Sequence, residues 1–182
     1  MSTTVAAEAR SQYLSFFLSG EEYGVSILRV KEILEYDTPT RVPGMPASIV
    51  GVINVRGRVV PIIDLAVRFG LPSSAVTRRS CIVVVELTLD GERTVMGLIA
   101  DSVSQVLDLA ADAIEPPPSF GTAVRADYLE GMAQTGESRK FVMLLDIDRA
   151  LSVQGLFAHL ANTELPASAG ELSTPLQAPS DA

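Results

Sequence analysis

An internal repeat constrains the fold of this chain more than any other feature. Three segments of the first half recur in the same order in the second half. Gly24 corresponds to Gly97, Gly51 to Gly131 and Asp64 to Asp146, so the offset grows from 73 through 80 to 82 residues. Insertions in loops produce such a slow drift. Units of this size bury little core alone, so the repeat predicts two small units that pack together.

Short β-type runs dominate the repeated region. Apolar strands are predicted over residues 12–18, 58–65, 81–89 and 140–147, and Asp90-Gly91 is a strong hairpin signal. A helix is predicted over about 148–161, and a helical turn within 26–34. With many short strands and few helical stretches, a pair of small barrels is the natural architecture.

Composition excludes several classes of function. The net charge is −8 and the pI is about 4.6, so nucleic acid is not expected as a partner. No apolar run approaches the roughly 20 residues of a membrane span, so direct membrane insertion is not expected. Cys81 and His159 are the only cysteine and histidine, which predicts neither a disulfide nor a metal site. No secretory signal begins the chain, so a cytoplasmic protein is expected.

Two aspartates are the candidates for acid–base chemistry. Asp64 and Asp146 each follow an apolar strand, but the repeat places them in different units, and a reaction needs convergent groups. They are better interpreted as caps of the segment after each strand. No catalytic residue and no cofactor is therefore predicted. A small β-barrel enzyme or ligand-binding protein of unknown substrate is the alternative, and it would need a deep pocket with convergent polar groups.

The stretch "GVINVRGRVVPIIDL" lacks the spacing of a nucleotide-binding loop. Residues 55–58 instead fit a hairpin tip, which presents Arg56 and Arg58. Arginine is enriched at protein interfaces because its planar fork binds carboxylates. Glu32 is the candidate partner of Arg56, and an exposed pair would contribute about 0–1 kcal/mol to stability.

Four stretches of the sequence carry a recognisable pattern: "FFLSGEEYGVSILRVKEIL", "TRVPGMPASIVGVINVRGRVVPIIDL", "GLIADSVSQVLDL" and "YLEGM". Together they resemble the CheW family of bacterial chemotaxis coupling proteins. The resemblance covers about residues 12–155 and implies an all-β fold of two SH3-like five-stranded barrels that share a hydrophobic core, with a C-terminal helix. It places the domain at 12–162, with the first barrel at roughly 20–80 and the second at roughly 81–150 plus the N-terminal strand. Residues 1–11 are expected to be flexible, and residues 163–182 disordered.

The resemblance implies an adaptor without catalysis. Its partners would be the regulatory domain of a CheA-type histidine kinase and the cytoplasmic helical tip of chemoreceptors, with further CheW-like subunits as additional partners. The protein would be recruited to membrane-associated receptor arrays. The resemblance assigns receptor binding to Ile27, Val30 and Cys81, with Glu32 and Arg56 as a supporting pair. Cys81 stands where a branched aliphatic residue is expected. Kinase binding falls to a second set: Val42, Met45, Gly51, Arg56 and Gly57.

Overall fold

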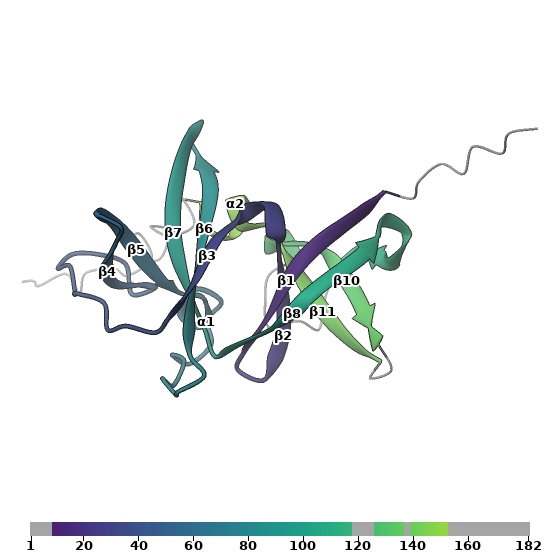
Figure 1. Cartoon of the computed structure of the whole chain (residues 1–182), viewed down its shortest axis with the longest axis horizontal. Helices are drawn as coiled ribbons and strands as arrows, with labels where there is room; N and C mark the ends of the chain where they lie inside the picture. Colours follow the sequence, from purple (N-terminus) through teal and green to yellow (C-terminus); the bar gives the residue numbers. More distant parts are fainter. Residues whose placement is uncertain (1–8, 118–125, 137–138, 153–182) are drawn as a thin grey trace, which may run out of the picture.

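The computed structural model describes residues 9–117, 126–136 and 139–152, and these residues form a two-sheet β protein (Figure 1). The strands are β1 (Arg10–Leu18), β2 (Glu21–Ser26), β3 (Val30–Glu35), β4 (Ile49–Val55), β5 (Arg58–Asp64), β6 (Cys81–Leu89), β7 (Glu92–Ala100), β8 (Ser102–Ala110), β9 (Ile114–Glu115), β10 (Leu129–Thr135) and β11 (Lys140–Leu145). The helical segments are η1 (Ile27–Arg29), α1 (Leu65–Arg68), η2 (Ala111–Ala113), η3 (Ala126–Tyr128) and α2 (Ile147–Ala150).

Each sheet encloses an apolar cluster of its own. The five-stranded sheet has the order β3-β6-β7-β5-β4, and the six-stranded sheet the order β8-β1-β2-β11-β10-β9. Leu34 of the edge strand β3 and Ile53 of the opposite edge strand β4 belong to one cluster, so the five-stranded sheet curls until its edges approach. The predicted all-β pair of barrels is confirmed, although the short strand β9 gives one of them a sixth strand.

The repeat is visible in the pairing of the strands. β2 runs parallel to β11 with Gly24 opposite Leu144, and β7 runs parallel to β5 with Gly97 opposite Ile62. Gly24 and Gly97 are equivalent at offset 73. Ile62 and Leu144 are equivalent at offset 82. Both units therefore contain the same parallel pair in the same register, and the predicted repeat is a structural one.

The two repeats exchange strands, which the predicted partition of the chain missed. β1 and β2 complete the six-stranded sheet with β8–β11, whereas β6 and β7 complete the five-stranded sheet with β3–β5. Residues 21–26, predicted to lie in the first barrel, belong to the six-stranded sheet, and residues 81–100, predicted to lie in the second barrel, belong to the five-stranded sheet. The N-terminal strand β1 lies between β8 and β2 in the six-stranded sheet. Each sheet draws on both halves of the chain.

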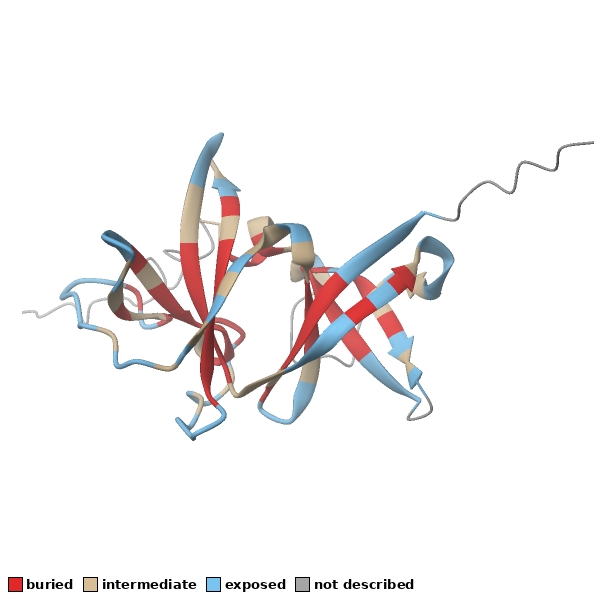
Figure 2. Ribbon diagram, in the orientation of Figure 1, coloured by how far each residue is buried: buried red, intermediate tan, exposed pale blue. Residues whose placement is uncertain are grey.

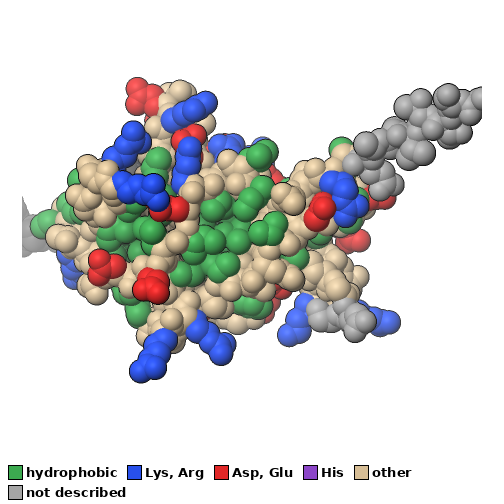
Figure 3. Space-filling model, viewed as in Figure 1, with side chains coloured by type: hydrophobic (Ala, Val, Ile, Leu, Met, Phe, Trp, Pro, Cys, Tyr) green, Lys and Arg blue, Asp and Glu red, His purple; other side chains and the backbone are tan. Residues whose placement is uncertain are grey.

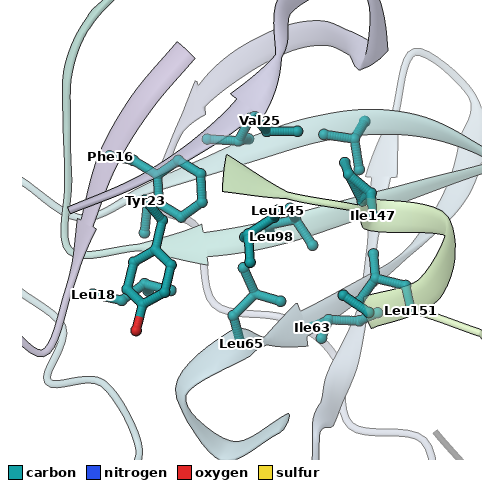
Figure 4. Close-up of a cluster of buried hydrophobic side chains, with 14 of the residues drawn as sticks. Phe16, Leu18, Tyr23, Val25, Ile63, Leu65, Leu98, Leu145, Ile147 and Leu151 are labelled. Carbon is teal, nitrogen blue, oxygen red and sulfur yellow. The ribbon is translucent and has the colours of Figure 1, made fainter. Parts of the chain in front are cut away.

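A shared core fills the space between the sheets. Buried positions concentrate where the sheets meet (Figure 2), and hydrophobic side chains also reach the surface there (Figure 3). Phe16 and Tyr23 from the six-stranded sheet pack with Ile63 and Leu98 from the five-stranded sheet (Figure 4). All four are 0–1% exposed. The predicted common hydrophobic core is therefore present, and it joins the barrels into one unit.

The two aspartates cap helices, as the second interpretation of the sequence predicted. The Asp64 carboxylate accepts hydrogen bonds from the backbone N–H of Ala66 (3.0 Å) and from the Ser73 hydroxyl (2.8 Å). The Asp146 carboxylate accepts one from the Arg149 N–H (3.2 Å). Each aspartate satisfies the open N–H groups at the start of its helix. Their roles are equivalent, in agreement with the repeat.

Two predictions about the ends of elements need correction. β1 begins at Arg10, so the predicted flexible segment 1–11 is too long. The helix predicted over about 148–161 is the short α2 in its described part. It ends because Leu151 forms a turn, and the Arg68 guanidinium caps the Ala150 carbonyl oxygen (Nε–O 2.9 Å). Residues 1–8 and 153–182, with the predicted tail, lie outside the described residues. In the described part of the chain, no helix has the length and apolar content of a membrane span.

Cutting the chain between Ala75 and Val76 tests the strand exchange. Of the pairings in the structure, the fragment 1–75 keeps only the hairpins β1–β2 and β4–β5, because β3 pairs with β6 alone. The fragment 76–182 likewise keeps hairpins, with β9 added to one of them. Isolated hairpins are marginally stable in water. We expect each fragment alone to lack a cooperative unfolding transition, and an equimolar mixture to regain the β-type circular dichroism of the intact chain. A fragment that folds alone would contradict the exchange.

Candidate protein-binding site

Apolar residues of two edge strands surface at the junction of the sheets. Val30 and Ile33 of β3 lie opposite Val85 and Val83, and both partners belong to the shared core. Residues directly opposite each other on paired strands point to the same face. Val30 and Ile33 therefore lie on the face that covers the shared core, but Ile33 is 45% exposed because β3 is an edge strand.

Strand β8 repeats this arrangement on the other sheet. Val103 and Val106 lie opposite Phe16 and Leu14, which also belong to the shared core. Val106 is 50% exposed. Val30 and Val103 are equivalent at offset 73, as are Ile33 and Val106. We call these four residues together with Ile27 the junction surface. In Figure 3, hydrophobic side chains gather in the middle of this face, between β3 and the pair of β1 and β8.

The predicted receptor-binding residues all border the shared core, but they do not form one tight cluster. Ile27 and Val30 are half-buried and pack against it. Cys81 is buried at the far end of the β3–β6 pairing, four residues along β6 from the partner of Val30, which is roughly 13 Å of strand. Burial raises the pKa of the Cys81 thiol, so it acts as a small apolar residue.

The predicted ion pair between Arg56 and Glu32 is present. Arg56 Nη2 lies 3.2 Å from Glu32 Oε2, with side chains that are 83% and 25% exposed. Arg56 and Gly57 both have positive φ and form the two-residue tip of the β4–β5 hairpin. The Asn54 side-chain oxygen accepts the Gly57 N–H (2.9 Å) and fixes that tip. Since β3 and β4 are opposite edges of their sheet, the ion pair helps to close the barrel.

A loop before β4 carries Val42 and Met45, which are 37% and 40% exposed. They line an open hollow of about 460 Å³ formed by residues 41–47, 49 and 50. Gly51 lies beneath this loop, where Thr40 and Val52 exchange two backbone hydrogen bonds (2.8 and 2.9 Å). A Cβ at Gly51 would collide with the Thr40 carbonyl oxygen. Gly51 is buried, so it holds the loop in place and does not itself face a partner.

The predicted kinase-binding residues thus fall into two groups. Val42 and Met45 lie near the start of β4, whereas Arg56 and Gly57 lie beyond its end, and seven residues of strand span roughly 20 Å. Ile33, Val103 and Val106 were not among the predicted site residues. The repeat alignment already paired them, so applying offset 73 to Val30 would have found the second strand of the surface. Among the described residues there is no group of three or more potential metal ligands.

These features define the class of the protein: a duplicated pair of small β-barrels that exposes apolar residues at its junction and loops. Residues 12–154 match the family model of the CheW-like domain. The chain is 40% identical over 141 residues to chemotaxis protein CheW of Klebsiella aerogenes, covering 78% of this chain and 81% of that protein. It is 30% identical over 149 residues to protein FrzA of Myxococcus xanthus, and the match covers 81% of this chain and 90% of that protein.

A solved structure agrees with these relatives. The crystal structure of scaffolding protein TtCheW from Thermoanaerobacter tengcongensis superposes with a TM-score of 0.70 at 30% identity, and the match covers 85% of this chain and 96% of that one. The chain belongs to the CheW-like domain family.

Replacing Gly51 by alanine tests how the loop is held. The added methyl group meets the Thr40 backbone, so we expect the free energy of unfolding to fall by roughly 3 kcal/mol. Gly57→Ala is the matched control, because Gly57 also has positive φ but open space around it. It should cost about 1 kcal/mol. Urea unfolding measures both, and equal losses would contradict the role given to Thr40.

Proposed function

We propose that this chain is a chemotaxis adaptor that couples chemoreceptors to a CheA-type histidine kinase. The observation that carries the proposal is the junction surface, in which equivalent residues of both repeats expose apolar side chains on a chain of the CheW-like family. Relatives named as chemotaxis proteins and as a scaffolding protein support the same role. Binding and positioning of partners, without catalysis, is what such a surface offers.

The junction surface is the proposed contact for the helical tip of a receptor. An amphipathic helix presents apolar side chains at i, i+3, i+4 and i+7, and it can lay this stripe on an apolar strip between two strands. Ile33 and Val106 offer exposed area, while Val30 and Val103 are held by the core behind them. Cys81 is buried in that core, so it would support the contact by packing and would not touch the receptor directly. A rigid surface lowers the entropy lost on binding.

The loop before β4 is the proposed contact for the regulatory domain of the kinase. Val42 and Met45 supply its apolar area, and Gly51 sets its position. The hairpin tip at Arg56 and Gly57 would form a second, separate contact for the same partner. The Arg56–Glu32 pair is largely exposed, so its contribution is orientation of the tip and only about 0–1 kcal/mol of stability.

Two separate contacts suit an extended assembly. An adaptor that binds a receptor at the junction and a kinase at the first loop can link both partners under the membrane. Further CheW-like subunits could occupy kinase positions in such an array. Each contact can be modest, because linkage within an array raises the effective concentration of the next partner. The protein would reach the membrane through the receptors.

Binding of a receptor tip fragment by calorimetry tests the receptor contact. Val30→Glu places a charge among apolar residues at the junction, so we expect affinity for the receptor fragment to fall at least about tenfold, since a desolvated charge costs more than about 1.4 kcal/mol. Affinity for the kinase regulatory domain should stay within twofold. Val76→Glu serves as the matched control, because Val76 is 55% exposed in the loop between the repeats. Unchanged receptor affinity in Val30→Glu would reject the contact.

Met45→Glu tests the kinase contact in the same assay. It should lower affinity for the kinase regulatory domain about tenfold, because it replaces apolar contact area by a charge that must be desolvated. Receptor affinity should not change. Since Met45 is 40% exposed, the unfolding midpoint should stay close to that of the unmodified protein. If Met45→Glu instead weakened receptor binding and left kinase binding intact, the loop before β4 would be the receptor contact and its assignment to the kinase would be wrong. No binding of either partner by the unmodified protein would reject the proposed function.

A further inference from the structure

We propose that Leu28 and Glu130 form a further contact site for the helical partner, which would carry an apolar side chain beside a Lys or Arg. The site lies next to the junction surface, on the six-stranded barrel. The inference rests on the proposed receptor contact and adds two residues to which neither the repeat nor the family resemblance assigns a role.

Leu28 is exposed without a structural reason. It is 90% exposed, the highest value among the large hydrophobic residues that the structure describes, although its neighbours Ile27 and Val30 pack on the shared core. At offset 73 its equivalent is Asp101, whose carboxylate accepts the Ser19 N–H (2.8 Å) and holds the β1–β2 turn. Between β7 and β8 this position therefore makes an internal hydrogen bond. Between β2 and β3 it presents an apolar side chain to solvent.

The segment that carries Leu28 is fixed to both barrels. Arg29 Nη2 lies 2.7 Å from Asp148 Oδ2, and the other Asp148 oxygen accepts the Thr88 N–H (3.0 Å). The 3₁₀ turn η1 is therefore tied to α2 and, through Asp148, to β6. Leu28 sits in the middle of this turn, so its position is set before any partner arrives. Such pre-organisation lowers the entropic cost of binding.

A hollow of about 390 Å³ adjoins Leu28 and contains a carboxylate that forms no ion pair with the described residues. Leu28, Ile27, Tyr13 and Glu130 are among its lining residues. The Tyr13 hydroxyl donates to Glu130 Oε2 (3.2 Å), but no described cation lies within ion-pair distance of this carboxylate. Asp108, on the same hollow, is paired with Arg10 at 2.9 Å. Burial raises the pKa of Glu130 above its ordinary value, while the Tyr13 hydrogen bond and the Arg29 cation, which is itself paired with Asp148, act in the opposite direction.

Charge complementarity selects the occupant. A partner cation at the hollow would form an ion pair with Glu130, which already accepts a hydrogen bond from Tyr13. An apolar side chain beside that cation would cover Leu28. Residues three or four positions apart on a helix lie on one face. A helix with an apolar residue at one position and Lys or Arg one turn away therefore fits, and it would be continuous with a helix on the junction surface through Ile27.

Calorimetry with the full-length protein and a receptor tip fragment tests the site. We expect Leu28→Ser to lower affinity for the fragment about tenfold, the effect of losing one buried leucine side chain. We expect Glu130→Gln to lower it about threefold and to flatten its dependence on salt, because an ion pair is lost. Val76→Ser is the control, as another exposed apolar side chain. Affinity for the kinase regulatory domain should stay within twofold in all three variants.

The outcomes separate this inference from the proposed function. If Val30→Glu weakens receptor binding while Leu28→Ser and Glu130→Gln do not, the further site is wrong and the receptor contact stands. If Leu28→Ser weakens kinase binding and not receptor binding, the assigned partner is wrong. If the unmodified protein binds no receptor fragment, the proposed receptor contact fails, and this site fails with it.

Discussion

The shared apolar core between the two sheets is the constraint on which the rest of the structure depends. It exists because β1–β2 and β6–β7 each leave their own repeat and complete the sheet of the other. The chain must therefore cross the junction at residues 27–29 and again at Asp101. The edge strands β3 and β8 start at these crossings, so their first apolar residues necessarily lie over the core. The junction surface is a direct consequence of the exchange.

Stability and orientation are provided by different interactions. Truncating one large core side chain such as Leu98 typically costs about 2–5 kcal/mol, whereas an exposed ion pair contributes about 0–1 kcal/mol. The core therefore holds the barrels together, and pairs such as Arg56–Glu32 and Arg29–Asp148 set the direction of the segments that carry them. The stacked rings of Phe16 and Tyr23 continue through Phe69, which follows α1, to Tyr128 of η3. The proposed binding surface therefore lies directly on this core.

The sequence predicts the strands, the repeat, the caps at Asp64 and Asp146 and the contact between Arg56 and Glu32, because each follows from local pattern or from equivalence. It does not predict the strand exchange. A strand has the same alternation of apolar residues whether it completes its own sheet or that of the other repeat, so hydrophobic pattern leaves the partner open. The exposure of Ile33 and Val106 was missed for a related reason: only the position of β3 and β8 at the sheet edges makes these residues accessible.

Duplication kept the core alike and let the surface diverge. The pairs Val30/Val103 and Ile33/Val106 preserve apolar character, since both members cover the same core. Equivalent positions outside this core differ: Leu28 corresponds to Asp101, and the half-buried Val50 of one bulge corresponds to Glu130 of the other. If both halves presented the same residues, a partner could bind either half in the same way. Unlike residues on a common frame give each half its own chemistry, and this difference between the halves is what the proposed binding of two different partners requires.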